Sequence, residues 1–373
     1  MDEIWTKEGL LPYVEKFFPG EAFGTIEEIG DGNINYVCRY TAPSGKTVIF
    51  KKADRLLKSS GRPLDQGRMA MEAGYLERAE QIAPGYTPHI LSFDAKESLL
   101  VMEDIGSYKN LRTLLLEGTL YPGTGKRIAE FLSAMLVETG SFLMEPEKKK
   151  DLVKRFINPE MCAISEDLVL KEPYYNDKNR NQIYPGEEAF VKRNLYENQV
   201  LRNRVLKLRM KFLDCSEALL HGDLHTGSIF VKPCGVKIID SEFAFFGPAG
   251  YDIGNVLAHF LIAYITGQHK GRDKDFLLQV ETEMRDFYES VFRLMEERLI
   301  KEANRDFYTD RFLKAYIENL KEDTLGYAGT EIIRRTVGDT SVPDITSVPE
   351  EKRLASDVAL LNMGIRLVMG EAF

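Results

Sequence analysis

The sequence predicts an α+β protein of two lobes, in which a small strand-rich N-terminal lobe precedes a large helical lobe that contains a few strands. Three observations lead to this prediction. The chain has 373 residues, which is more than one hydrophobic core usually serves. Its first hundred residues are rich in alternating β-branched and aromatic residues. From about Leu111 onward, apolar residues instead recur at helical spacing.

The N-terminal lobe is expected to cover residues 1–102. Strand-like runs at 24–30, 31–40 and 46–52 are separated by turn residues at 31–32 and 43–45. A helix is expected at 68–81, and two further strand-like runs lie at 89–94 and 98–104. Residues 103–106 would then form a hinge, and residues 107–373 the helical lobe.

Helical periodicity dominates the second lobe. Residues 126–143 and 190–213 both place apolar residues at three-to-four spacing. The second run carries several Lys and Arg residues, which we interpret as a solvated helix face. Residues 218–245 form a strand-like island, and more helices follow, with a proline-containing loop at 341–349.

Composition excludes several classes of protein. The net charge of -9 disfavours binding to phosphate backbones or anionic lipids, so neither a nucleic-acid nor a membrane partner is expected. The four cysteines show no CxxC spacing, which disfavours a zinc site or a disulfide framework and suggests a reducing compartment. The N-terminal MDEIWTKEGL does not resemble a signal peptide, and no apolar run approaches the length of a membrane span. These features predict a cytoplasmic protein.

The strongest local signal is the pair of segments 219–231 and 236–245, LLHGDLHTGSIFV and VKIIDSEFAF. Asp223 and Asp240 each lie near the end of a short strand, seventeen positions apart, so they can converge on one point. In kinases one such Asp accepts the proton of the attacking hydroxyl, and the other holds the magnesium that bridges the phosphates. Together with the order of the lobes, this pattern is typical of a protein-kinase-like fold with Asp223 as the base and Asp240 on Mg²⁺.

Glu242 is the expected second metal ligand. Protein kinases place a metal-binding Asn five residues after the catalytic Asp, and Ser228 occupies that position here. Glu242 lies two residues after Asp240, and in an extended segment such residues point the same way. Carboxylate oxygens suit magnesium, so we expect Asp240 and Glu242 to share one cation.

Other interpretations of these segments are weaker. His221 and His225 have a spacing that suits zinc on a helix, but Gly222 and the flanking strands disfavour a helix. The GxSxG motif of serine hydrolases is absent around Ser228. PGTGKR at 122–127 lacks the first Gly and the final Ser or Thr of a P-loop. A purely structural role for one buried carboxylate is common, but three at the ends of apolar strands would be costly without a ligand.

The N-terminal lobe offers candidates for binding ATP. Gly30, Gly32 and Asn33 lie in a possible glycine-rich turn that would approach phosphate, although Asp-Gly is also a common hairpin turn. Lys51 could hold the α- and β-phosphates, with Glu72 as its ion-pair partner. Lys52 is the rival of Lys51, because strand alternation points only one of them inward. A connector with Glu103 and Ile105 would offer backbone groups to adenine.

Arg334 and Arg335 lie next to each other near the C-terminus. Adjacent helical residues point about 100° apart, so one of the two would usually face solvent. Surrounded by apolar residues, the pair could instead hold a transferring phosphate.

With these residues assembled, the sequence resembles the methylthioribose kinase family, a branch of the protein-kinase-like fold shared with aminoglycoside phosphotransferases and choline kinases. The resemblance rests on segments spread from about residue 29 to residue 338: HGDLHTGSIF, the stretch at 240–254, IGDGNINYV, VMEDI, KKDLVKRFINPEMC and GTEIIRRTVG. It implies transfer of the ATP γ-phosphate to the C1 hydroxyl of the sugar 5-methylthioribose in methionine salvage, and a homodimer. It also implies that Asp223 is the base, that Asp240 and Glu242 bind magnesium, that Lys51 meets the phosphates, and that Arg334 and Arg335 contact sugar and phosphate.

The sequence departs from the family pattern in two places. Residues 54–68 follow the family only loosely, with Arg62 where a tryptophan is expected, and the Asp-Pro-Glu of the family is Asp-Ser-Glu at 240–242. These departures leave open a kinase of another small sugar or amino alcohol. A catalytically silent nucleotide-binding module is a further alternative, because a fold does not guarantee its chemistry.

Overall fold

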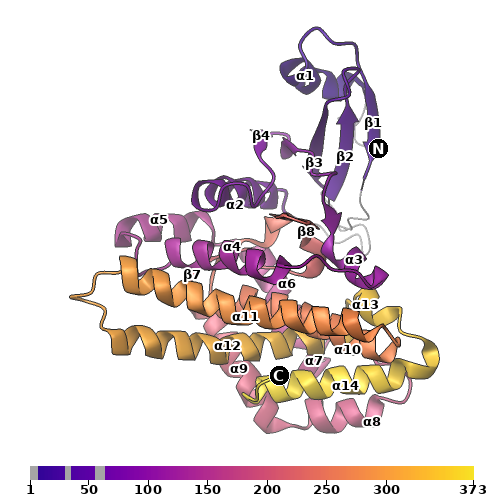
Figure 1. The fold of residues 1–373 in the computed structure, drawn as a ribbon, viewed down its shortest axis with the longest axis vertical. Helices are drawn as coiled ribbons and strands as arrows, with labels where there is room; N and C mark the ends of the chain where they lie inside the picture. The colour runs from indigo at the N-terminus through magenta and orange to yellow at the C-terminus, as the bar shows by residue number, and fades with distance from the viewer. Residues whose placement is uncertain (1–6, 30–34, 55–63) are drawn as a thin grey trace.

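Two lobes of different architecture make up the chain in the computed structural model, which describes residues 7–29, 35–54 and 64–373. Figure 1 shows the sheet of the N-terminal lobe standing on a larger body of helices. The predicted order, a strand-rich lobe followed by a helical lobe with a few strands, is confirmed. The division at 102, 103–106 and 107 stays a prediction, although strand β5 does end at Glu103.

The N-terminal lobe contains one antiparallel five-stranded sheet in the order β1-β2-β3-β5-β4. Its strands are β1 (Thr25–Glu28), β2 (Asn35–Thr41), β3 (Thr47–Ala53), β4 (Ile90–Asp94) and β5 (Leu99–Glu103). Helix α2 (Arg68–Ile82) follows β3 as predicted, whereas helix α1 (Lys7–Phe17) was not predicted from the sequence.

Strand alternation sorts the residues of β3 between two hydrophobic clusters. Val48 and Phe50 pack with residues of α1, whereas Ile49 and Ala53 pack with residues of α2. Successive side chains of a strand point to opposite faces, so Lys51 shares the α2 side with Ile49. This alternation aims Lys51 toward the space between the lobes.

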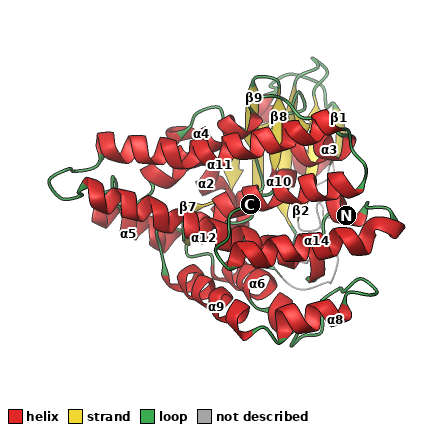
Figure 2. Cartoon of the chain, turned by 60° about the horizontal axis from the view of Figure 1, so that its bottom comes forward, coloured by secondary structure: helices red, strands yellow, loops and turns green. Residues whose placement is uncertain are grey.

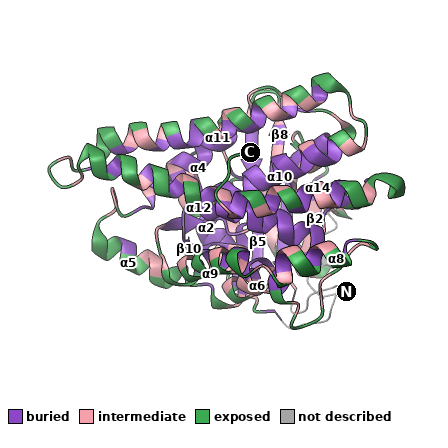
Figure 3. Cartoon of the chain, turned by 90° about the horizontal axis from the view of Figure 1, so that it is seen from below, coloured by how far each residue is buried: buried purple, intermediate pink, exposed green. Residues whose placement is uncertain are grey.

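Helices form most of the second lobe, and Figure 2 shows that they make up the larger part of the molecule. The longer helices are α3 (Leu111–Glu117), α4 (Thr124–Glu138), α5 (Pro146–Arg155), α6 (Pro159–Leu170), α9 (Gln199–Asp214), α10 (Gly250–His269), α11 (Lys274–Glu302), α12 (Asp310–Val337) and α14 (Glu350–Val368). Helix α10 is the centre of this lobe, since it packs against α11, α12 and α14 and nearly all of its residues are buried (Figure 3).

Two predictions about this lobe are corrected. The run at 190–213 is not one helix: α8 (Glu188–Val191) passes into a π-helical turn (Lys192–Tyr196), and α9 starts afresh where the Asn198 side chain accepts a hydrogen bond from Leu201 N. The expected loop at 341–349 contains a short helix, α13 (Pro343–Thr346). Proline at a first helical position explains this helix, because its missing N–H needs no partner there.

The strand-like island at 218–245 is confirmed as two small sheets. One pairs β7 (Ala218–Leu220) with β10 (Phe245–Gly247), and the other joins β6 (Lys109–Asn110), β8 (Ile229–Lys232) and β9 (Gly235–Ile238). The segment between β9 and β10 is not extended, since Asp240 has a left-handed backbone (φ 65°) and residues Ser241–Phe243 form a 3₁₀ turn. Within the described residues, no helix is long and apolar enough to cross a membrane.

A buried pair of acids joins α8 to α14, far along the chain from the strand island. Glu187 and Asp357 are both fully buried, and Arg353 Nε donates to Asp357 Oδ2 at 2.6 Å. Burial, reinforced by the charge of Asp357, raises the pKa of Glu187 from 4.5 to about 8. The folded protein therefore keeps a proton on Glu187 that the unfolded chain releases near pH 4.5.

This pair predicts a pH-dependent stability. Stability contributed by the retained proton is complete below pH 4.5 and is lost as the pH rises toward about 8. The free energy of unfolding of the wild-type chain should fall relative to that of Glu187→Gln over this range, by up to about 1.4 kcal/mol per pH unit for one proton. Urea unfolding at several pH values measures the difference, and a difference that stays constant with pH would contradict the prediction.

Candidate active site

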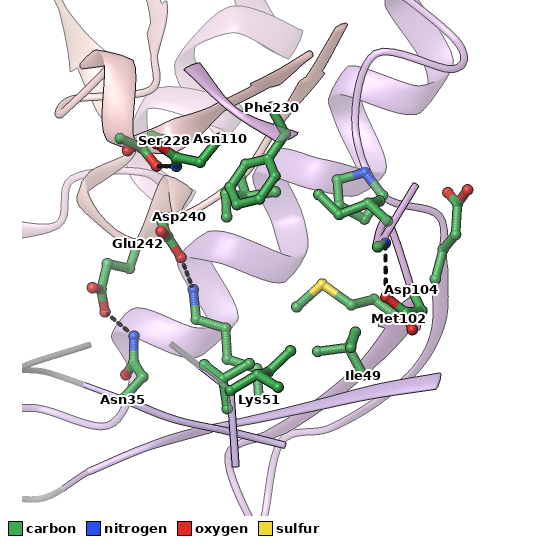
Figure 4. Close-up of a pocket in the computed structure, with 18 of the residues that line it drawn as sticks. Asn35, Ile49, Lys51, Met102, Asp104, Asn110, Ser228, Phe230, Asp240 and Glu242 are labelled. Atoms are coloured by element: carbon green, nitrogen blue, oxygen red, sulfur yellow. Dashed lines mark hydrogen bonds and ion pairs between the residues drawn. The ribbon is translucent and has the colours of Figure 1, made fainter. Parts of the chain in front are cut away.

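A cavity of about 660 Å³ lies between the two lobes, a size that is typical of small-molecule sites. One end is apolar and is formed by side chains of the sheet, the hinge and β8. The other end carries the charged residues that the sequence analysis selected, as Figure 4 shows. Its lining includes Val37, Ile49, Lys51, Met102, Asp223, Phe230, Asp240 and Glu242.

The loop after β7 presents Asp223 to this cavity. Asp252, in the first turn of α10, accepts hydrogen bonds from His221 N at 2.6 Å and Gly222 N at 3.0 Å. Gly222 has φ +84°, and a Cβ there would lie 2.2 Å from the carbonyl oxygen of Phe243. Only glycine therefore lets the loop pass so close to the 3₁₀ turn. The hydrogen bonds to Asp252 on helix α10 fix the position of the backbone that precedes Asp223.

Asp223 is surrounded by groups that favour its charged form. Its Oδ1 lies 3.3 Å from Arg334 Nη2 and 3.6 Å from Arg335 Nη2, and its Oδ2 lies 3.5 Å from His225 Nε2. Burial acts to raise the pKa of Asp223, but His225 and the two arginines outweigh it and lower the pKa to about 2. Burial also lowers the pKa of His225 well below its usual value, so the arginines carry the compensating charge at neutral pH.

Lys51 joins the two lobes through two ion pairs. Its Nζ lies 2.7 Å from Glu72 Oε1 on α2 and 2.6 Å from Asp240 Oδ1, next to β9 (Figure 4). Burial disfavours the charge of Lys51, but Asp240 and Glu72 outweigh it and raise its pKa. The rival Lys52 lies on the other face of β3, where its Nζ is 3.7 Å from Glu97 Oε2. Lys51 is therefore the lysine inside the cavity.

Glu242 lies beside Asp240 in the cavity, but not for the predicted reason. The expectation that residues 240–242 are extended is wrong, because the left-handed Asp240 begins a 3₁₀ turn. Glu242 Oε2 accepts hydrogen bonds from Asn35 Nδ2 at 3.0 Å and Arg68 Nε at 2.9 Å. In the part of the chain that the structure describes, Asp240 Oδ2 and Glu242 Oε1 accept no hydrogen bond. Each carboxylate thus keeps one oxygen for a cation, and this donor set fits magnesium.

Comparison with known proteins shows the family. The model of the phosphotransferase enzyme family matches residues 162–287. A methylthioribose kinase from Yersinia pseudotuberculosis is 35% identical over 360 residues, which cover 94% of this chain and 87% of the relative. Another, from Exiguobacterium sibiricum, is 36% identical over 347 residues, with 92% of this chain and 87% of the relative covered.

The chain belongs to the methylthioribose kinase family. Membership makes it a small-molecule kinase, for which ATP is the implied co-substrate. A crystal structure of a choline kinase from Cryptosporidium parvum has the same fold, with a TM-score of 0.53 at 14% identity, covering 98% of this chain and 97% of that one. The predicted protein-kinase-like fold is confirmed.

The hinge of this kinase-family chain carries an ion pair that sequence reasoning missed. Glu103 and Ile105 line the cavity as expected, but the Glu103 side chain turns to Lys237, whose Nζ lies 3.0 Å from its Oε2. Arg39 on β2 donates to Asp104 through Nε at 2.7 Å and Nη2 at 3.3 Å. This bidentate pair ties the sheet to the hinge at the apolar end of the cavity. Binding of adenine by the hinge backbone stays a prediction.

Both candidate arginines of the family pattern are buried on α12. Arg334 and Arg335 are each 7% exposed and both point an Nη2 atom at Asp223. The usual expectation that one of two adjacent arginines faces solvent is therefore wrong here. Gly30, Gly32 and Asn33, the expected phosphate-binding turn, lie outside the described residues.

Several residues that fix this site carried no clear signal in the sequence. Asn158 is buried, and its Nδ2 donates to the carbonyl oxygens of Glu242 and Ala244 at 2.8 and 3.0 Å. Asn158 has a left-handed backbone (φ 42°) just before Pro159. The Asn-Pro pair was a possible signal for a special turn, whereas nothing in the local sequence identified Arg68 as the partner of Glu242.

Proposed function

We propose that the chain transfers the γ-phosphate of ATP to the C1 hydroxyl of 5-methylthioribose, producing 5-methylthioribose 1-phosphate and ADP. The observation that carries the proposal is the convergence of Asp223, Lys51, Asp240 and Glu242 on one cavity. Membership in the methylthioribose kinase family supports the choice of sugar. The resemblance to this family also leads us to propose a homodimer.

In this proposal Asp223 accepts the proton of the acceptor alcohol. As the alcohol oxygen bonds to the γ-phosphorus, its proton moves to a carboxylate oxygen of Asp223, and the bond from that phosphorus to the bridging oxygen breaks to release ADP. A carboxylate with a pKa of about 2 is a weak base at neutral pH. It therefore orients the hydroxyl first and takes the proton late, once bond formation has made the alcohol acidic.

Lys51 would hold the α- and β-phosphates at the charged end of the cavity, while Arg334 and Arg335 would contact the sugar and the transferring phosphate. Lys51 is held between Glu72 and Asp240 without a ligand, so its position is set in advance. Such fixed donors stabilise charge that develops on the phosphoryl oxygens, and they need little reorganisation when it does. Two arginines beside Asp223 also disfavour a polycationic aminoglycoside as acceptor.

Asp240 and Glu242 would hold Mg²⁺ through Asp240 Oδ2 and Glu242 Oε1, which accept no hydrogen bond from the described residues. When bound, the ion neutralises charge on the phosphates. Glu242→Gln is expected to raise the Mg²⁺ concentration for half-maximal activity by about 10- to 100-fold, because a carboxylate ligand is replaced by a neutral amide.

The control for this prediction is Glu103→Gln, in the same cavity but with its carboxylate turned to Lys237. This variant should keep the wild-type Mg²⁺ dependence. An unchanged Mg²⁺ dependence in Glu242→Gln would mean that Glu242 only anchors Asn35 and Arg68.

Release of ADP with MgATP and a panel of acceptors tests the proposed function. The panel contains 5-methylthioribose, ribose, choline and kanamycin, and Asp223→Ala is the inactive control. Turnover is expected with 5-methylthioribose, and phosphorus NMR should place the new ester on C1. Higher kcat/KM for another acceptor would replace the proposed substrate, and no turnover with any acceptor would favour a silent nucleotide-binding module.

A further inference from the structure

The two arginines on α12 converge although their helix positions should separate them. Adjacent residues of an α-helix leave the axis about 100° apart. Nevertheless, the Nη2 atoms of Arg334 and Arg335 lie 3.3 and 3.6 Å from the same oxygen of Asp223. Long, flexible side chains need a fixed point to hold such an arrangement, because each loses considerable rotamer entropy.

Glu331 provides that fixed point one helical turn earlier. Positions i+3 and i+4 both neighbour position i on a helix surface. Arg334 Nε donates to Glu331 Oε2 at 2.5 Å, and Arg335 Nε donates to Glu331 Oε1 at 2.8 Å. Each guanidinium is thus held by its Nε, which leaves its Nη atoms to face Asp223.

A histidine from the neighbouring helix holds Glu331 in turn. His259 on α10 lies with Nε2 3.1 Å from Glu331 Oε1, and both side chains are almost fully buried. Burial lowers the pKa of His259 to about 4, so the ring is neutral and donates its Nε2–H. The two helices can approach closely because Gly254 has no side chain. A Cβ at this position would lie only 2.8 Å from Ala328 N. Three donors on two helices therefore fix one carboxylate.

We propose that Glu331 is a positioning residue for the phosphoryl transfer, acting by aiming both arginines at the point where Asp223 meets the acceptor. The inference rests on the proposed function, in which Asp223 is the base and the arginines contact the transferring phosphate. Glu331 also balances charge, because two guanidiniums face two carboxylates in this cluster. Without Glu331 the Nε atoms of the arginines would lose their shared anionic acceptor, and the two side chains would no longer be held in their present orientation toward Asp223.

The variant Glu331→Gln tests the proposal. A glutamine keeps the size of the side chain, but its NH₂ group meets an N–H donor, so one arginine loses its acceptor. The expected result is a kcat about 10- to 100-fold lower, from loss of aligned donors, with the KM for ATP within about twofold of wild type. The matched control is Glu283→Gln, a buried carboxylate that instead accepts hydrogen bonds from Gly123 N and Gly125 N. It should lower stability without this loss of kcat.

A double-mutant comparison separates positioning from a general structural effect. If Glu331 acts through the arginines, then Glu331→Gln should lower kcat by less than about threefold in an Arg334→Lys, Arg335→Lys background. An equal loss in both backgrounds, or wild-type kcat in the single variant, would overturn the proposal. Should Glu331→Gln not fold, Glu331→Asp serves in its place, because the shorter carboxylate cannot reach both Nε atoms.

A crystal structure of the Glu331 variant gives a test that does not depend on the substrate. At least one Nη2 atom is expected to move away from Asp223, and two arginines still at 3.3 and 3.6 Å would contradict the proposal. If the wild-type chain phosphorylates another alcohol but not 5-methylthioribose, the proposed substrate is wrong, but the proposed role of Glu331 is not affected. The kinetic comparison is then made with that alcohol.

Discussion

Asp223→Asn is expected to lower kcat by about 10³-fold or more while leaving the affinity for MgATP within a few-fold of wild type. The amide keeps the size of the side chain but cannot accept the proton, and it no longer compensates Arg334 and Arg335. Steady-state kinetics measure kcat, and calorimetric titration with a non-hydrolysable ATP analogue measures the affinity.

Asp214→Asn, at the exposed end of α9, is the control for this substitution and should be indistinguishable from wild type. A kcat within tenfold of wild type for Asp223→Asn would remove Asp223 as the base. A parallel loss of nucleotide binding would instead point to a disturbed loop, since Gly222 and His221 hold this loop on Asp252.

Lys51→Ala is expected to lower kcat/KM for ATP by about 10²- to 10³-fold, because a charge-assisted contact to phosphate is removed from a buried position. The loss also leaves Glu72, which is 1% exposed, without its cationic partner. Steady-state kinetics at varied ATP concentration measure the effect.

The adjacent Lys52→Ala provides the matched control, since it removes the same charge from the other face of β3. Its kcat/KM should stay within about threefold of wild type, because Lys52 faces away from the cavity and its Nζ lies 3.7 Å from Glu97 Oε2. Equal losses in the two variants would contradict the assignment of Lys51 to the phosphates.

Local patterns in the sequence predicted most of the fold and most of the charged end of the cavity. The period of two along β3 separated Lys51 from Lys52, and the short strands around Asp223 and Asp240 were readable from their apolar residues. The same patterns brought Glu72 and the two arginines into consideration. The structure places Lys51, Asp223 and Asp240 in one cavity. It pairs Glu72 with Lys51 and puts both arginines beside Asp223.

What escaped prediction depends on tertiary contacts. The turn that follows the left-handed Asp240 is held by Asn158, a residue from a distant segment that donates to the carbonyl oxygens on either side of Phe243. The break before α9 arises from a cap at Asn198, a local signal that the helical periodicity on both sides concealed. Glu331 looked like any helical glutamate until α10 brought His259 beside it. No local pattern encodes the contacts of Asn158 and His259, because their partners lie far away in the sequence.

A crystal structure with magnesium, a non-hydrolysable ATP analogue and 5-methylthioribose tests the central claim most directly. The account predicts the C1 oxygen within about 3 Å of a carboxylate oxygen of Asp223 and about 3–3.5 Å from the γ-phosphorus, in line with the leaving oxygen. A sugar bound outside the cavity, or with C1 turned away from Asp223, would contradict it.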